Sequence, residues 1–272
     1  MLRRRSRRAT STNRPIITLL SDFGLADSYV AAMKAVLIRT CPDARMIDVT
    51  HQVPRHDVLC GSITLERAVD GFPPGTIHLA VVDPGVGSDR RLLIAGINEQ
   101  LIVCPDNGLI TWPWRMHGGG EAHELTWRPT RTASHTFHGR DILAPVAGQL
   151  ASGTTVAELG QSIDDPILLD IVPANAPATH GCVIHLDQFG NATTNIPVDV
   201  LGPRPQATVH VNRRTIGKLK KTYWDVAPGK PLALIGSSGL LEIAVRDGSA
   251  KNDLKIRVGD DVTLRNGTGL RL

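Results

Sequence analysis

The sequence predicts a two-part protein, with an α/β domain followed by a small all-β domain. Strand-like and helix-like stretches alternate in the first half, as in an α/β domain with a mostly parallel sheet. From about residue 166 only short strand-like runs remain, separated by turn residues, which is typical of a small barrel. The length of 272 residues allows two cores. We therefore predict a basic tail at residues 1–14, an α/β domain at 15–165, a linker at 166–180 and a β-barrel domain at 181–272.

The first elements alternate between strand and helix. An apolar strand at residues 16–20 is followed by a helix at 27–39, which Asp27 or Ser28 can cap. The dipeptide Cys41-Pro42 then ends this helix, because proline disfavours helical geometry in the residue before it.

The alternation continues through the first half. A strand at residues 45–49 precedes a helix at 58–69, which Asp57 can cap. The run at 77–82 is nearly all apolar, as expected of a strand buried on both faces. The remaining elements are a hairpin of strands at 92–97 and 101–104 and a helix at 142–150.

The second half contains only short apolar runs and turns. Turns are expected at Pro228-Gly229-Lys230 and Arg265-Asn266-Gly267. The predicted strands span residues 182–186, 207–211, 232–235, 241–245, 255–258 and 262–264.

The composition is that of a globular protein. Hydrophobic residues make up 42% and charged residues 21% of the chain, and no apolar run approaches the roughly 18 residues of a membrane-spanning helix. Five arginines in the first ten residues account for the net charge of +4, and the remaining chain carries −1. Nucleic-acid-binding domains carry basic charge on a folded face. We therefore expect no nucleic-acid or membrane partner and a cytoplasmic location.

The cysteines and histidines do not form a metal-binding pattern. No two cysteines are close enough for a zinc-type pair or a disulfide framework, so we expect reduced thiols. The pairs His51 with His56 and His135 with His138 lack the HExxH form, and we predict no metal site.

Acidic side chains follow three of the predicted strands. Asp22 and Asp27 follow the first strand, Asp83 follows the third, and Asp106 follows the fifth. Each alone is also an ordinary turn residue. Ligands of open α/β sheets bind outside the carboxyl ends of the strands, so three acidic positions at one edge favour a site. The nearby glycines form neither a dinucleotide-binding nor a P-loop motif.

Five motifs in the chain match those of one family in order. The first half contains Ser21-Asp22-Phe23-Gly24, Val82-Asp83-Pro84-Gly85 with Arg90-Arg91, and Phe137-His138-Gly139-Arg140-Asp141. The second half contains Asp187-Gln188-Phe189-Gly190-Asn191 and Ser237-Ser238-Gly239. From residue 16 to 265 the chain thus resembles the S-adenosyl-L-methionine (SAM) hydroxide adenosyltransferases, which are relatives of the bacterial fluorinase and chlorinase.

The resemblance implies both an architecture and a reaction. The family's fold is an α/β domain joined to a β-barrel domain, and its members are homotrimers with active sites between neighbouring subunits. The implied reaction is hydrolysis of SAM to adenosine and L-methionine, by in-line attack of an activated water or hydroxide at ribose C5′. SAM is the substrate, and no cofactor is expected.

The resemblance also assigns roles to individual residues. Asp83, Arg90 and His138 are implied to activate the water, and which of them takes the proton stays open. Asp22 is implied to bind the ribose hydroxyls, with Asp27 supporting its loop or contacting the methionine amine. The other implied contacts are Phe137 near the reacting carbon, Asp187 on the methionine ammonium, Ser237 on the methionine carboxylate, and Phe189 with Asn191 on adenine.

Two alternatives to hydrolysis remain, a halide-using relative and a SAM- or adenosine-binding protein with little turnover. The halogenases carry a tyrosine at the position of Asp83, lack a histidine at His138, and the fluorinase has a serine at Gly139. A carboxylate in the nucleophile pocket repels a halide, which favours water. A protein that only binds SAM has no need of a water-activating trio. The chain also departs from the family's pattern at His56, near a tryptophan that walls the ribose pocket of the halogenases, at Gly236, where the family has an asparagine, and at Arg246-Asp247.

Overall fold

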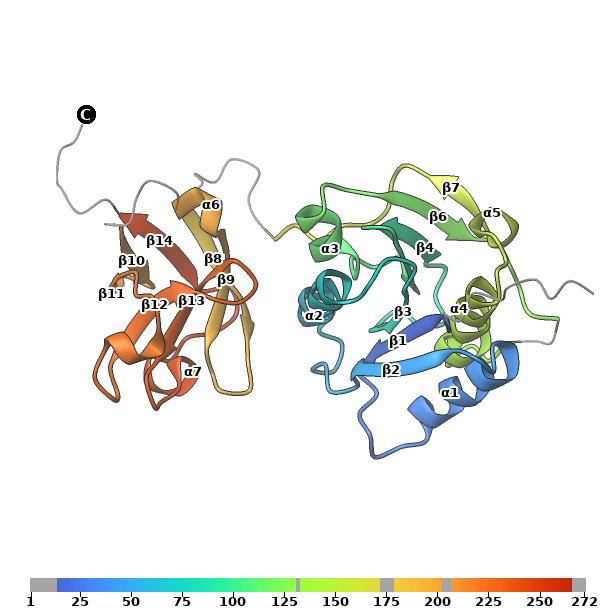
Figure 1. Ribbon diagram of the computed structural model, residues 1–272, viewed down its shortest axis with the longest axis horizontal. Helices are drawn as coiled ribbons and strands as arrows, with labels where there is room; N and C mark the ends of the chain where they lie inside the picture. The colour runs from blue at the N-terminus through green and yellow to red at the C-terminus, as the bar shows by residue number, and fades with distance from the viewer. Residues whose placement is uncertain (1–13, 131–132, 172–178, 202–206, 266–272) are drawn as a thin grey trace, which may run out of the picture. The chain divides into compact units, whose positions relative to one another are not determined.

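The structure is a computed structural model that describes residues 14–130, 133–171, 179–201 and 207–265 (Figure 1). The chain divides into two compact units between Leu169 and Asp170. The predicted tail before Arg14, the middle of the predicted linker and most of the turn at residues 265–267 lie outside the described residues. In the described part of the chain, no helix is long and apolar enough to cross a membrane.

The N-terminal unit is built on a seven-stranded sheet, with the order β2-β1-β3-β5-β4-β6-β7. The parallel pairs join β2 (Arg45–Thr50), β1 (Ile16–Ser21), β3 (Ile77–Val81) and β5 (Gln100–Pro105). The antiparallel strands are β4 (Leu92–Ile97), β6 (Glu121–Leu125) and β7 (Gly160–Ile163). The predicted α/β class and the hairpin of β4 and β5 are confirmed, whereas β6 and β7 had no strand prediction.

Helices pack on both faces of this sheet. One hydrophobic cluster contains Ile17 and Leu19 of β1 together with side chains of α1 (Tyr29–Thr40) and α4 (Ala144–Ala151). A second cluster contains Leu20 together with side chains of α2 (Val58–Gly71) and the segment before α3 (Thr111–Met116). Successive residues of a strand point to opposite faces, so β1 is covered on both sides. The short helix α5 (Val156–Leu159) precedes β7.

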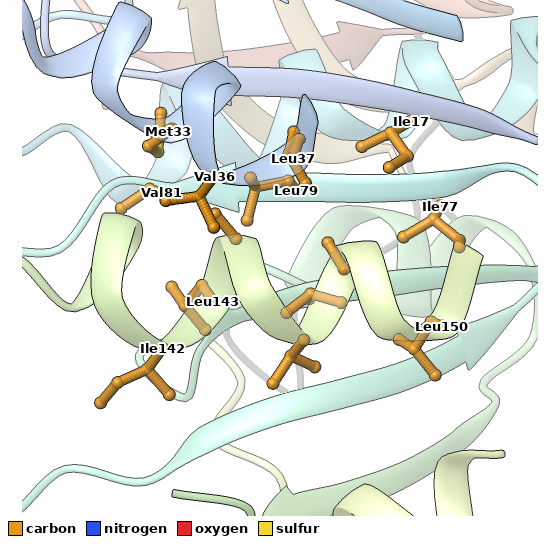
Figure 2. Close-up of a cluster of buried hydrophobic side chains, with 14 of the residues drawn as sticks. Ile17, Met33, Val36, Leu37, Ile77, Leu79, Val81, Ile142, Leu143 and Leu150 are labelled. Carbon is orange, nitrogen blue, oxygen red and sulfur yellow. The ribbon is translucent and has the colours of Figure 1, made fainter. Parts of the chain in front are cut away.

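Local sequence sets the ends of these helices. Ser28 occupies the N-cap position of α1 without a side-chain capping bond, and α1 ends at Cys41 as predicted. Asp57 caps α2, as predicted, by accepting a hydrogen bond from Cys60 N at 2.9 Å. The predicted helix at 142–150 begins earlier, with a π-helical turn, η1 (Gly139–Leu143), that leads directly into α4. Figure 2 shows Leu143 of this turn in the first cluster, together with Met33 and Leu37 of α1.

The C-terminal unit is an antiparallel seven-stranded sheet, with the order β11-β10-β14-β8-β9-β13-β12. The two end strands also approach each other. Leu219, directly after β11, forms a bridge with Ala233 of β12, and Lys220 N–H donates to the Ala233 carbonyl at 2.8 Å. The sheet is therefore nearly closed, which confirms the predicted barrel-like class. Its strands are β8 (His180–Leu186), β9 (Ala192–Pro197), β10 (Thr208–Val211), β11 (Arg214–Lys218), β12 (Pro231–Ile235), β13 (Leu240–Val245) and β14 (Asp261–Arg265).

One predicted strand of this unit is wrong. Residues 255–258 form no strand, because Lys255 has a φ of 59° and the backbone next turns between Arg257 and Asp260. Only Ile256 is buried there, whereas Val258 is 48% exposed. The strands β9 and β11 had no strand prediction. Three short helices complete the unit: α6 (Val198–Leu201), η2 (Tyr223–Asp225) and α7 (Ala250–Asp253).

Candidate functional site

Two loops of the N-terminal unit leave adjacent parallel strands at the same edge of the sheet. Ser21 at the end of β1 pairs with Val81 at the end of β3. The loop that begins with Asp22 therefore starts beside the loop that contains Asp83. This edge is where open α/β sheets bind ligands.

Asp83, Arg90 and His138 are in direct contact. Arg90 Nε donates to Asp83 Oδ1 at 2.6 Å, and Arg90 Nη2 donates to Asp83 Oδ2. Arg90 Nη2 also lies 3.1 Å from His138 Nδ1. The side chains of Arg90 and Asp83 are only 9% and 6% exposed. The structure thus brings together the three residues that the sequence singled out, although they span more than fifty positions.

Two glycines allow the loop after β3 to make this contact. A Cβ atom on Gly85 would lie 3.1 Å from Arg90 Cδ, so glycine leaves room for the arginine to fold back toward Asp83. Gly87 has a φ of 86°, and a Cβ there would lie 2.7 Å from the carbonyl oxygen of His135. The loop therefore packs closely against the segment that leads to His138.

The position of His138 is fixed by the π-helical turn that follows it. His138 is the N-cap of η1, and π-helical turns are rare and concentrate at functional sites. Asp141 within that turn accepts a hydrogen bond from Ser134 N at 2.9 Å and pairs with Arg140. This carboxylate closes the segment 134–141 on itself and holds His138 beside Arg90.

Burial and the contact with Arg90 together set the protonation state of His138. Burial lowers the pKa of His138, and the Arg90 guanidinium lowers it further, while Asp83 opposes the shift. The ring is therefore neutral near pH 7. Arginine can only donate hydrogen bonds, so Nδ1 is the acceptor and the ring proton lies on Nε2. His138 thus has a hydrogen-bond donor at Nε2 for a ligand.

Asp22 is oriented by the neighbouring loop. Its Oδ2 accepts a hydrogen bond from His56 N at 2.9 Å, and His56 has a φ of 63°, which is uncommon for a residue other than glycine. Asp27 is exposed near the start of α1. His56 therefore contacts Asp22 through its backbone N–H.

Three aromatic rings connect the Asp22 loop to the His138 segment. The Phe137 ring lies 5.8 Å from that of Phe23 and 5.3 Å from that of Tyr29, both nearly edge-to-face. Because Phe23 follows Asp22 and Phe137 precedes His138, these contacts bring the two polar groups to one region. Phe23 belongs to the first sequence motif but carried no predicted role.

Asp106, the third acidic position at this edge, has a structural role. It is 1% exposed; its Oδ2 accepts from Arg91, and its Oδ1 accepts from Ile167 N at 2.8 Å. Arg91 also pairs with Asp165, at 2.7 Å. Asp106 and Arg91 thus anchor the start of the predicted linker to the N-terminal unit. The acidic positions at the sheet edge do not share one function.

The C-terminal unit holds Asp187 and Asn191 in one tight turn. Asp187 Oδ1 accepts from the backbone N–H groups of Phe189 and Asn191, at 2.9 and 2.8 Å. Asp187 Oδ2 accepts from Asn191 Nδ2 at 3.1 Å, which leaves Asn191 Oδ1 as an acceptor. The turn presents the Phe189 ring outward, and this residue is 68% exposed.

Ser237 lies in another loop of the same unit and is exposed. It belongs to the β12–β13 turn, which is closed by the hydrogen bond from Gly236 N to the Leu240 carbonyl at 2.9 Å. Elsewhere in the unit, after the far end of β13, the Arg246 guanidinium stacks 3.8 Å from the centre of the Trp224 ring, and Trp224 is 77% exposed. This stacked pair was not predicted. The signal available in the sequence was the atypical Arg246, because neither the exposure of Trp224 nor its contact with Arg246 can be read from a sequence.

A buried network at the end of β1 was also missed. His51 is 3% exposed and lies between Ser21 and Asp48. The signal was the spacing of Asp48 and His51 at the end of a strand. Among the described residues, no three His, Cys, Asp or Glu side chains gather as a metal site would require.

The structure is that of a two-unit protein, with a polar cluster of Asp83, Arg90 and His138 at the edge of an α/β sheet. Residues 17–160 match the model of the SAM hydroxide adenosyltransferase N-terminal domain, and residues 181–263 match that of the C-terminal domain. The chain therefore belongs to the SAM hydroxide adenosyltransferase family, and the resemblance seen in its motifs is confirmed.

Individual relatives agree with this assignment. Proteins named (R)-S-adenosyl-L-methionine hydrolase are 40% identical in Salinispora tropica, over 93% of this chain and 98% of theirs, and 37% identical in Thermus thermophilus, over 92% and 99%. A fluorinase from Nocardia brasiliensis is 25% identical, over 95% of this chain and 100% of its own. A crystal structure of an uncharacterized Thermotoga maritima protein matches with a TM-score of 0.84 and 37% identity, covering 92% of this chain and 100% of that one.

Proposed function

We propose that this protein hydrolyses SAM to adenosine and L-methionine. The observation that carries the proposal is the arginine that joins a carboxylate and a neutral imidazole at the sheet edge. The higher identity to the named SAM hydrolases than to the fluorinase supports the same reaction.

The chemistry of SAM explains why the trio of Asp83, Arg90 and His138 suits the reaction. The sulfonium is already a good leaving group, so the protein needs no general acid. The difficult part is to place water in line with the C5′–S bond and to remove its proton. Positioning contributes several kcal/mol to such a step, and a poised base adds roughly 10²- to 10⁴-fold.

Each member of the trio has a distinct part in the proposed step. His138 donates from Nε2 to the attacking oxygen. Arg90 holds His138 and Asp83 in place by donating a hydrogen bond to each of them. Asp83 accepts the proton of the water, because a carboxylate has further lone pairs beyond those that Arg90 occupies. As the oxygen bonds to C5′, the C5′–S electron pair leaves with sulfur, which becomes the neutral thioether of methionine.

The substrate contacts come from both units. Asp22 accepts from the ribose hydroxyls through the oxygen that His56 leaves available, Asp27 supports that loop, and Phe137 packs beside the reacting carbon. In the C-terminal unit, the free Oδ1 of Asn191 suits the amino group of adenine and Phe189 offers a stacking face. Asp187 and Ser237 take the methionine ammonium and carboxylate.

The proposed assembly is a homotrimer, in which one subunit's N-terminal unit and its neighbour's C-terminal unit complete each site. Residues for the reaction lie in one unit, and exposed recognition residues lie in the other. Sedimentation at increasing dilution tests this assembly. Full activity of a dilute monomer would contradict it.

The decisive experiment follows the oxygen atom. Turnover of SAM in ¹⁸O-labelled water is expected to place the label on the 5′-oxygen of adenosine and none on methionine. Label in methionine, or a 5′-halogenated product in the presence of halide, would refute hydrolysis at C5′. Binding of SAM without turnover would instead identify a SAM-binding protein.

A further inference from the structure

A chain of polar side chains ends at the loop that carries Asp22. Ser21 Oγ lies 2.7 Å from His51 Nδ1, and His51 Nε2 lies 3.2 Å from Asp48 Oδ1. Asp48 Oδ2 accepts from Lys34 Nζ at 2.6 Å. The chain thus runs from a partly exposed lysine through a 3% exposed histidine to Ser21, which is fully buried.

The polar groups of this chain can all be oriented in one direction. Phe23 N–H donates to Ser21 Oγ at 3.3 Å, and the Ser21 hydroxyl donates to His51 Nδ1. The ring proton then lies on Nε2 and faces Asp48. Burial raises the pKa of Asp48, but the bonds from Lys34 and His51 outweigh it and bring the pKa below its ordinary value. The carboxylate is therefore charged and favours this tautomer.

The chain is not a second hydrolytic centre. Ser21, His51 and Asp48 are the residue types of a serine hydrolase triad, in which the serine must reach the substrate. Here Ser21 is 0% exposed. Its hydroxyl is confined to the interior, so it cannot attack a ligand.

The backbone contacts show what the chain holds in place. Gly24 N–H donates to the His51 carbonyl at 2.7 Å, and Val53 N–H donates to the Ser21 carbonyl at 3.4 Å. These bonds tie the loop after β1 to the loop after β2. The second of these loops also supplies the His56 N–H that binds the Asp22 carboxylate. His51 therefore sits where the two loops that orient Asp22 are joined.

We propose that His51 is a positioning residue, which sets the Asp22 carboxylate for the ribose diol through Ser21 and the joined loops. The inference rests on the proposed function, because it takes the ribose of SAM or adenosine as the ligand of Asp22. Replacing His51 removes the join and lets Asp22 adopt other orientations. The affinity for the nucleoside then falls.

A second buried histidine provides a matched control. His78 on β3 is 0% exposed, and its Nδ1 lies 2.7 Å from Thr18 Oγ1 on β1, the same distance as between His51 and Ser21. Its Nε2 lies 2.8 Å from Gln100 Oε1, and Gln100 donates to the Val69 carbonyl. His78 therefore has the burial and polar pairing of His51, but its partners lie away from the Asp22 loop.

The experiment compares the adenosine affinity of the full-length variants by calorimetry. His51→Leu is expected to weaken binding about tenfold, the size of a charge-assisted hydrogen bond, whereas His78→Leu changes it less than about twofold. His51→Asn, whose Oδ1 can accept from the Ser21 hydroxyl in place of Nδ1, restores most of the affinity. In an Asp22→Ala background, His51→Leu adds no further loss, because the carboxylate that it positions is absent.

The outcomes separate this proposal from the proposed function. Equal affinities of His51→Leu and His78→Leu, or an additive loss in the Asp22→Ala background, would overturn the positioning role while SAM hydrolysis still stood. A wild-type protein that binds adenosine but does not hydrolyse SAM would overturn the proposed function and leave the positioning role intact. If His51→Leu does not fold, Ser21→Ala is expected to give the same loss, and unchanged affinity in it would reject the proposal.

Discussion

The two units of this protein present their candidate residues in opposite ways. In the N-terminal unit, Asp83 and Arg90 are nearly buried and are bonded to each other and to His138. In the C-terminal unit, Ser237 is exposed, and Phe189 is 68% exposed. The first arrangement is a bonded cluster within one unit, whereas the second consists of exposed side chains.

This difference suggests a division of labour between reaction and recognition. Groups that must act on a developing charge benefit from being fixed in advance, since they need no reorganisation during the step. Groups that recognise a flexible substrate can be carried on turns. Substitutions of Asp83, Arg90 and His138 are therefore expected to lower kcat, and substitutions on the C-terminal turns are expected to raise KM.

The largest expected effect is a loss of turnover from the N-terminal trio. Replacing Asp83 by Asn, Arg90 by Gln or His138 by Ala is expected to lower kcat about 10²-fold or more, with little change in SAM affinity. Double replacements are expected to cost much less than the product of the single effects, because the residues act as a unit. Steady-state kinetics together with SAM titration measures both quantities.

The matched control for this prediction is the neighbouring arginine. Arg91 is also paired with carboxylates, but those are Asp106 and Asp165, which anchor the linker. Arg91→Gln is expected to lower the melting temperature and to leave kcat within about twofold, since it touches no reacting atom. An equal loss of kcat in Arg91→Gln would show that general destabilisation, and not the trio, explains the first result.

The next effect is on binding within the same unit. Asp22→Ala is expected to weaken adenosine binding about tenfold, because a charge-assisted hydrogen bond to a diol contributes roughly 1.5–3 kcal/mol. Asp83→Ala is expected to weaken it less, because Asp83 faces the nucleophile and not the ribose. Calorimetric titration compares the two variants, and unchanged affinity in Asp22→Ala would remove the ribose assignment.

The sequence predicted the parallel half of the first sheet because its strands are apolar runs separated by capped helices. It also found Asp83, Arg90 and His138, since each lies in a motif. Their contact could not be derived from spacing, because it depends on Gly85 leaving room for Arg90 and on a π-helical turn after His138. Neither feature has a periodicity that a sequence pattern reveals.

The errors of prediction also have physical causes. Polar and apolar side chains alternate in residues 255–258, as in a strand. However, Lys255 has a left-handed backbone conformation and the chain turns at Arg257, so this segment is not extended. The acidic residue Asp106 looked like a third site carboxylate, because sequence shows its position at the sheet edge but not the arginine that occupies it. Burial and partner choice are properties of the tertiary fold.

A smaller effect is expected from the C-terminal unit. Phe189→Ala is expected to raise KM about fivefold and to leave kcat nearly unchanged, as the loss of one stacking ring predicts. Val258→Ala, which shortens another exposed apolar side chain of the same unit, is the control and is expected to change neither constant. A fall in kcat as large as in the Asp83, Arg90 and His138 variants would contradict the assignment of Phe189 to substrate recognition.

The smallest expected effect is the pH dependence of the wild-type protein. Burial and Arg90 lower the pKa of His138 below its ordinary value of 6.5, so the neutral ring persists as the pH falls through 6.5. Protonation would place a proton on Nδ1 facing Arg90 and break the bond that holds the trio. We therefore expect kcat to change less than about twofold between pH 8 and 6.5 and to decline only at lower pH.

The variant His138→Gln tests the same assignment, because glutamine offers a donor near the position of Nε2 but cannot titrate. We expect more turnover in it than in His138→Ala, and its decline on the acid side lacks the step due to His138. A wild-type decline that begins well above pH 6.5 would contradict the lowered pKa of His138, and turnover in His138→Gln no higher than in His138→Ala would contradict the donor role at Nε2.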